Sequence, residues 1–177
     1  MIIQIRGTSG SGKTWVVKEI MKEYDWEPHY VENRKRPLYY TSGDIIVLGH
    51  YEIDCGGCDT IGSAPKVFQT IQNLKVPYKV MITEGLLWGE DVKWTVQLED
   101  TVRSLYLHTS LEDCLNNVKK RQGGIEPKDP NRVVRKLSKR IQTISRTMPR
   151  LQSVGVYCRR ASSNQSVKII RKWINAV

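Results

Sequence analysis

The sequence predicts an α/β fold in which helices cover both faces of a parallel β-sheet. Five short apolar runs rich in β-branched residues alternate with segments of helical periodicity, which is typical of such a sheet. A glycine-rich loop joins the first apolar run to the first helical segment. With 177 residues and no internal repeat, the chain is expected to form a single domain over residues 1–177.

The first unit runs from residue 2 to about residue 23. Residues 2–6 form an apolar run suited to a buried strand, and a helix is expected from residue 15. Between them, residues 7–14 read GTSGSGKT, which fits the P-loop pattern G-x-x-x-x-G-K-[ST]. This order aims backbone N–H groups and a helix N-terminus at phosphate oxygens. We therefore predict a P-loop NTPase that binds ATP, with a nucleoside- or nucleotide-kinase-like five-stranded parallel sheet.

The P-loop also assigns the nucleotide contacts. Lys13 should reach the β- and γ-phosphates, and the hydroxyl of Thr14 should ligate Mg²⁺. The expected nucleotide-binding residues of this loop are Gly7, Thr8, Ser9, Gly10, Ser11, Gly12, Lys13 and Thr14.

The remaining elements follow in order along the chain. Strands are expected at about residues 45–49, 78–83, 104–108 and 154–158, and helices at about 64–73, 111–121, 131–148 and 166–176. Asn131 is expected to cap the long third helix of that series. Residues 25–43 are less regular, and their mixture of charged and aromatic residues fits either a substrate-facing insertion or a solvated hairpin.

The formal net charge is +10 and is unevenly distributed. Residues 1–118 contain 12 Lys/Arg against 16 Asp/Glu, a net of −4, whereas residues 119–177 contain 16 against 2, a net of +14. ATP binding needs only a few cations, so the basic C-terminal third predicts a polyanionic partner, for which nucleic acid is the candidate. A basic face that only serves solubility is the alternative.

Composition also sets the expected compartment. No apolar run approaches the ~20 residues of a membrane span, and the chain opens directly into the first strand, so we expect a cytoplasmic protein without membrane contact. Four cysteines fit a reducing compartment. Cys55 and Cys58 have the spacing of half a zinc site, but no second pair follows, so a tight glycine turn is expected there and no zinc.

The strand at 78–83 separates the classes of P-loop protein. The sequence lacks the Asn-Lys-x-Asp guanine motif of GTPases, and no pair of acids closes this strand as in oligomeric ATPases. The strand instead ends on Glu84 and Gly85, as in small kinases. Glu84 is therefore the candidate for the Mg²⁺ shell, directly or through water. An ordinary surface or helix-capping acid is the alternative.

A kinase needs a carboxylate that orients and deprotonates the acceptor hydroxyl. The ligand crevice of a doubly wound sheet lies at the carboxyl ends of its strands, which points to the segment after residue 49. Asp54 is favoured as the base and Asp59 is second, ahead of Glu52 and His50.

Further contacts are expected from a lid at about residues 121–132 and from the last strand. Arg121 and Arg132 flank the lid, where a guanidinium would neutralise the transferring phosphoryl group. Arg159 or Arg160 is expected to stack on adenine, and the backbone near Ala161 to read its edge. The candidate contacts to the acceptor and to DNA are His50, Tyr51, Trp88, Arg132 and Arg135, with ordinary core packing as the alternative for the aromatic residues.

Four segments resemble the small P-loop kinases of bacterial viruses, some of which are 5-hydroxymethyluracil DNA kinases. They read MIIQIRGTSGSGKT at 1–14, GHYEIDCGGCDTI at 49–61, EGLLWGED at 84–91 and RRASS at 159–163. Many families share the P-loop, whereas the HYEIDCGGCD segment is much more specific. The resemblance covers residues 1–14 and 45–177 and is weak over 25–44.

The resemblance implies a reaction. The γ-phosphoryl group of ATP would pass to the 5-hydroxymethyl oxygen of a modified thymine base in DNA, as a step in phage thymine hypermodification. Confining the reaction to a crevice favours flipping of the target base. Two alternatives remain, a kinase for free nucleosides or nucleotides and a non-catalytic nucleotide-binding module.

Overall fold

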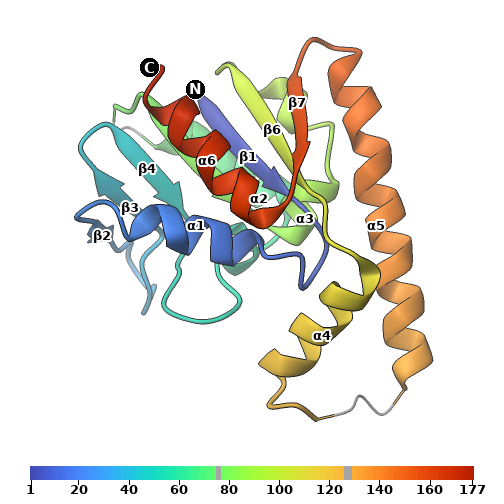
Figure 1. The fold of residues 1–177 in the computed structure, drawn as a ribbon. Helices are drawn as coiled ribbons and strands as arrows, with labels where there is room; N and C mark the ends of the chain where they lie inside the picture. The colour runs from blue at the N-terminus through green and yellow to red at the C-terminus, as the bar shows by residue number, and fades with distance from the viewer. Residues whose placement is uncertain (75–76, 126–128) are drawn as a thin grey trace.

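A computed structural model of the protein describes residues 1–74, 77–125 and 129–177. Helices separate its strands along the chain, except that β2, β3 and β4 follow one another directly (Figure 1). In order they are β1 (Ile2–Arg6), α1 (Lys13–Met21), β2 (Glu27–His29), β3 (Tyr39–Ser42), β4 (Ile45–Leu48), η1 (Cys58–Thr60), α2 (Ala64–Asn73), β5 (Val80–Glu84), α3 (Leu86–Glu90), η2 (Thr95–Gln97), β6 (Val102–Leu107), α4 (Leu111–Arg121), α5 (Pro130–Gln152), β7 (Tyr157–Ala161) and α6 (Ser163–Ile174).

One sheet of seven strands has the order β2-β3-β4-β5-β1-β6-β7. The five strands from β4 to β7 in this order run parallel, which confirms the predicted five-stranded parallel sheet. β2 and β3 extend it with antiparallel pairs, so residues 25–43 form a strand pair as in the hairpin alternative, although Tyr39 and Tyr40 of β3 are buried rather than solvated. β2 is short, contains Pro28 and forms the edge of the sheet, where a missing backbone donor is tolerated.

The sheet buries both faces because successive side chains of a strand point to opposite sides. On one face, Ile3 and Ile5 of β1 pack against α1 and α6 through Val16, Val17, Ile20, Ile169, Ile170 and Trp173. On the other face, Ile2 and Met81 pack against α2 and α3 through Val67, Ile71 and Trp88, and α5 lies alongside α3 (Figure 1).

Three predicted element boundaries were wrong. β7 begins at residue 157 rather than 154, because α5 continues to Gln152 and a turn follows with Gly155 at φ 84°. The cap of α5 is Asp129, whose Oδ1 accepts the backbone N–H of Arg132 at 2.8 Å, and not Asn131. α6 begins at Ser163 because Ser162 and Gln165 form a capping box.

The predicted lid and the expected lack of a membrane span can be compared with the structure only over the described residues. The predicted lid lies partly outside them, because residues 126–128 are not described. Within the described ranges, no helix combines the length and the apolar character needed to cross a membrane.

A fully buried arginine holds the P-loop strand to the α3 face of the sheet. The Arg6 guanidinium donates to the carbonyls of Gly89 and Asp91 at 2.7 and 2.8 Å. It also donates to Gln4 Oε1 at 2.6 Å and to Thr95 Oγ1 at 2.8 Å. Burial lowers the pKa of Arg6, but these oxygen acceptors compensate for the lost water. The network fixes α3 and η2 relative to the strand that leads into the P-loop.

Replacement of Arg6 should destabilise the fold strongly. Arg6→Met leaves several buried oxygens without donors, so we expect a loss of about 3 kcal/mol in the free energy of unfolding, or a Tm lower by roughly 6–12 °C. Thermal unfolding followed by circular dichroism measures this. Arg150→Met, at an exposed position of α5, is the control, and an equal loss in both variants would contradict the role of the network.

Candidate active site

A cavity of about 680 Å³ lies at the carboxyl ends of β1 and β5. Its wall combines the P-loop, the start of α1, the loop between β4 and α2, α4 and the start of α6. The residues that line the cavity include Ser9, Gly10, Ser11, Gly12, Lys13, Thr14, Trp15, Asp54, Cys55, Asp59, Glu84, Leu86, Asn117, Lys120, Arg121, Ser163 and Asn164.

The P-loop is closely packed from behind. Gly10 and Gly12 have φ of 78° and 94°, which only glycine adopts without strain. A Cβ atom at Gly10 would collide with the carbonyl of Cys114, and one at Gly12 would lie 2.7 Å from Ser163 Oγ. Lys13 is buried, and its Nζ donates to the Thr8 carbonyl at 3.0 Å. The loop therefore keeps a fixed shape with its lysine folded over it.

Glu84 is the buried acid of the site. Thr14 Oγ1 donates to Glu84 Oε1 at 2.8 Å, so the two predicted Mg²⁺ ligands are adjacent. Burial raises the pKa of Glu84 to about 7, although Lys13 and the Thr14 hydrogen bond act in the opposite direction. A Cβ atom at Gly57 would lie 2.5 Å from Glu84 Oε1, so glycine is required where this loop crosses β5. The structure thus confirms the glycine turn at Cys55–Cys58.

The oxygens of Glu84 and Thr14 fit a magnesium ion. Mg²⁺ usually takes one or two protein carboxylates and fills its other positions with water and substrate phosphates. Within the described residues, no group of three or more His, Cys, Asp or Glu side chains could hold a metal by itself. The protein therefore offers part of a coordination shell beside the phosphate loop.

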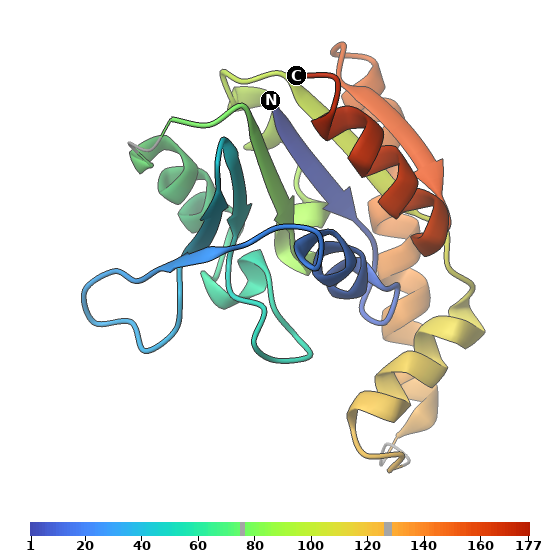
Figure 2. The same ribbon diagram turned by 60° about the vertical axis from the view of Figure 1, so that its left-hand side comes forward.

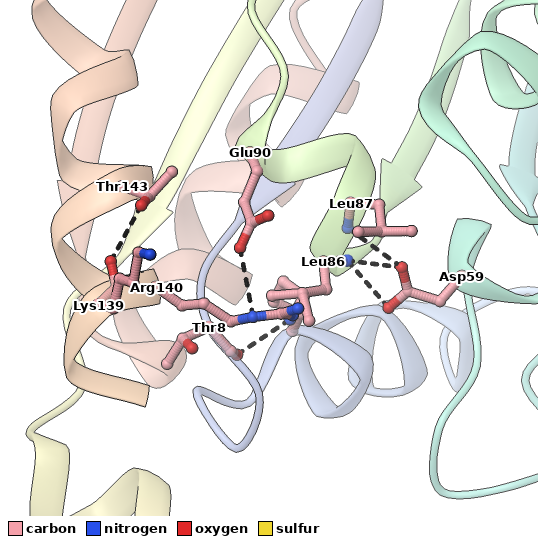
Figure 3. Close-up of polar contacts among 9 residues, drawn as sticks. Thr8, Asp59, Leu86, Leu87, Glu90, Lys139, Arg140 and Thr143 are labelled. Atoms are coloured by element: carbon pink, nitrogen blue, oxygen red, sulfur yellow. Dashed lines mark hydrogen bonds and ion pairs between the residues drawn. The ribbon is translucent and has the colours of Figure 1, made fainter. Parts of the chain in front are cut away.

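Both candidate bases line the cavity, but their surroundings differ. Asp59 accepts the backbone N–H of Leu86 at 2.8 and 2.9 Å and fixes the start of α3 (Figure 3). Asp54 is exposed and has no hydrogen bond or ion pair among the described residues. The carboxylate of Asp54 thus has both oxygens available, whereas that of Asp59 is already hydrogen-bonded to the backbone of α3.

Basic residues approach the cavity from α4 and stay outside it on α5. Arg121 reaches the loop after β4, where its guanidinium donates to Cys55 Sγ at 2.8 Å. Arg132 and Arg135 are exposed on α5 and do not line the cavity. Nearer the sheet, Arg140 of α5 faces Glu90 of α3 at 3.6 Å (Figure 3).

Several predicted contacts lie elsewhere. Tyr51 and Trp88 are buried in the two hydrophobic clusters, where Tyr51 donates to the Leu48 carbonyl and Trp88 to Thr83, so neither ring is available to stack on a substrate. His50 is buried and lines a separate groove behind the loop. Arg159 and Ala161 belong to β7 and do not line the cavity, because the strand is shifted along the chain.

The cavity also contains residues that the sequence did not indicate. Trp15 is its one aromatic lining residue within the described chain, and its side chain is 44% exposed. Asn117 donates to the Gly10 carbonyl at 2.8 Å, and Ser163 to that of Ser11 at 3.3 Å. The capping box at Ser162 and Gln165 was the available signal for the α6 side of the site, whereas Trp15 lies inside a segment of ordinary helical periodicity.

The amino-acid sequence is similar to those of two phage kinases. No protein-family model matches it. It is 30% identical over 184 residues to a 5-hmdU DNA kinase of Pseudomonas phage PaMx11, covering 99% of this chain and 97% of that protein. A 5-hmdU DNA kinase of Delftia phage PhiW-14 is 31% identical over 110 residues, 56% of this chain and 41% of that protein.

Solved structures agree on the fold. A deoxyadenosine kinase from M. mycoides with bound dCMP and dCDP matches over the full length of both chains, with a TM-score of 0.51 and 15% identity. The same kinase with bound dCTP gives a TM-score of 0.50 at 12% identity. The structural likeness shows a shared fold, whereas the sequence match over the whole chain shows the family. The chain belongs to the family of phage 5-hmdU DNA kinases.

Proposed function

We propose that this protein transfers the γ-phosphoryl group of ATP to the 5-hydroxymethyl group of hydroxymethyluracil in DNA. The observation that carries the proposal is one cavity in which Lys13, Thr14 and Glu84 meet the two carboxylates of Asp54 and Asp59. A phosphate-binding half and a proton-accepting half facing one space are what phosphoryl transfer to a hydroxyl requires. The names of the phage relatives support the base and the polymer as acceptor.

Each side chain has a role in this reaction. Lys13 binds the β- and γ-phosphates, and Thr14 and Glu84 would hold Mg²⁺, which would supply positive charge beside the phosphates. Asp54 accepts the proton of the hydroxymethyl group, and the oxygen of that hydroxymethyl group forms a bond to the γ-phosphorus. The bond from that phosphorus to the β,γ-bridging oxygen breaks and ADP leaves. Arg121 stabilises the charge that spreads over the transferring group.

The exposed face of α5 supports DNA as the acceptor. This helix of 23 residues contains no acid, and one face presents Arg132, Arg135, Lys136, Lys139, Arg146 and Arg150. At 1.5 Å per residue it is about 34 Å long, comparable with one turn of duplex DNA. Figure 1 shows α4 and the first part of α5 extending beyond the carboxyl ends of the strands, beside the candidate active site.

The direct test is transfer of labelled phosphate from γ-³²P-ATP with Mg²⁺. We expect label in DNA that contains 5-hydroxymethyluracil and none in thymine DNA. Lys13→Ala should lower transfer by roughly 100-fold or more, because it removes the cation on the developing charge. Label only in the free nucleoside or nucleotide would replace DNA by a small molecule as the acceptor, and ATP binding without any transfer would leave a non-catalytic module.

The two carboxylates can be distinguished by matched amide variants. Asp54→Asn should lower kcat by roughly 10²–10⁴-fold with little change in the KM for ATP, because an amide cannot accept the proton. Asp59→Asn should cost less, since its amide oxygen can still accept the N–H of Leu86. Steady-state kinetics on modified DNA compare them, and the reverse order of losses would make Asp59 the base.

The raised pKa of Glu84 predicts two pH dependences. Without nucleotide, the native protein keeps a proton that the unfolded chain releases near the usual pKa of 4.5, so the free energy of unfolding should fall as pH rises from about 4.5 to about 7. Mg²⁺ needs the ionised acid, so Mg²⁺–ATP binding should tighten over the upper part of that range. Urea unfolding and calorimetric titration at about pH 6 and pH 8 measure the two effects.

Glu84→Gln is the control for both effects, because its side chain does not titrate. We expect this variant to lose the fall in stability and to bind Mg²⁺–ATP weakly at both pH values. If it kept the wild-type tightening, the titrating group would be ATP or another residue.

A further inference from the structure

A second concave surface lies behind the loop that carries the candidate bases. This groove of about 450 Å³ is lined by Arg34, Lys35 and Arg36 from the loop between β2 and β3, and by His50, Ile53 and Thr60. The two hollows share one thin wall, because Ile53 and Thr60 face the groove while their neighbours Asp54 and Asp59 face the active-site cavity. A ligand in the groove would therefore lie against the loop that carries Asp54 and Asp59.

No ion pair among the described residues neutralises the positive charge of the groove, although the carboxylate of Glu52 is close enough to act on His50. Arg34 donates to the Thr60 carbonyl at 3.3 Å, and Arg36 NH1 lies 3.3 Å from His50 Nε2. Both acceptors are neutral, and none of the described acids forms an ion pair with Arg34, Lys35 or Arg36. Three consecutive cations thus line a hollow whose described lining includes no carboxylate.

His50 keeps Arg36 oriented without neutralising it. A guanidinium can only donate, so His50 Nε2 accepts and the proton of the neutral ring sits on Nδ1. Burial lowers the pKa of His50 and Arg36 lowers it further, while the Glu52 carboxylate acts in the opposite direction, so the balance favours the neutral ring. The Nδ1 atom is buried without a hydrogen-bond partner within the described residues, so the polar groups of this wall are not all satisfied by the protein itself.

We propose that this groove binds a backbone phosphate of the DNA strand that carries the target base. Arginine is the side chain best shaped for phosphate, because its planar fork can donate two parallel hydrogen bonds. The inference rests on the proposed function, since it says how DNA lies at that same site. The α5 cations alone would hold DNA on one side of the cavity, and the groove supplies contacts on the other.

The arrangement of the loops supports such a path. In Figure 2 the loop between β2 and β3, in blue, lies on one side of α1 and of the loop after β4, while the α4–α5 pair lies on the other. A strand that crosses the active-site cavity between these two sides meets cations at both ends. The target nucleotide would then sit over Asp54, between two anchored phosphates.

The test uses the double variant Arg34→Gln/Arg36→Gln in the full chain. We expect the KM for modified DNA to rise about tenfold and the slope of log affinity against log salt to fall by about 1 to 2. The kcat on DNA, the KM for ATP and activity on the free 5-hydroxymethyl nucleoside should stay unchanged. Lys172→Gln, which removes an exposed cation of α6, is the matched control and should change none of these values.

A second measurement locates the phosphate. Neutral methylphosphonate linkages are placed one at a time along the modified oligonucleotide. One position near the target base should weaken wild-type binding about tenfold and have no effect in the double variant, because both changes remove the same contact. Arg34→Lys/Arg36→Lys, which keeps the charge, should restore part of the affinity and shows that the loop still folds.

Three results would overturn the groove assignment. The first is a loss of DNA affinity no larger than that of Lys172→Gln, and the second is an equal loss on the free nucleoside. The third is a loss confined to the nucleoside 5′-monophosphate, which would make the groove a site for a monomer phosphate. Failure of the proposed function is distinct, because wild-type protein would then transfer no phosphate to modified DNA, while the salt dependence of DNA binding would still test the groove.

Discussion

The close approach of three chain segments around the carboxylate of Glu84 is the constraint on which the site depends. The P-loop contributes Thr14 and Lys13, β5 contributes Glu84 itself, and the loop after β4 passes so near that residue 57 must be glycine. A buried carboxylate is tolerated only with donors and cations at hand. Any side chain at Gly57 would push this loop outward, and it would carry the two candidate bases away from the phosphates.

The Arg6 network extends that constraint across the fold. Arg6 directly precedes the P-loop, and its hydrogen bonds reach the end of α3, η2 and, at 3.4 Å, Thr147 of α5. The strand that supplies the phosphate loop is therefore tied to the helix that carries six exposed cations on one face. A buried cation satisfied by oxygens has few alternative arrangements, since each one leaves unpaired polar groups in the core. This rigidity fixes the position of the P-loop relative to α5.

Features that depend on neighbouring residues in the sequence could be predicted, whereas features that depend on distant segments could not. The P-loop, Glu84 and Asp54 depend on local motifs and on strand ends, and the structure brings them into one cavity. Tyr51 and Trp88 also follow strand ends, but which side of the chain faces the core is decided by distant segments. The Gly-Asp turn at 43–44 was a local hairpin signal for β3, whereas β2 depends on pairing across the sheet edge. The wrongly placed caps of α5 and α6 did have local signals, Asp-Pro at 129–130 and Ser-x-x-Gln at 162–165.

Charge placement explains how one cavity can serve a polymeric acceptor. The transfer step itself needs only groups that touch ATP and one hydroxyl, and a free nucleoside would satisfy them equally. Discrimination in favour of DNA must come from cations that a nucleoside never reaches. The body formed by residues 1–118 has a net charge of −4, yet three of its 12 Lys/Arg occur consecutively at the groove. Cations on the two sides of the cavity both attract the strand and set its path over the base-accepting site.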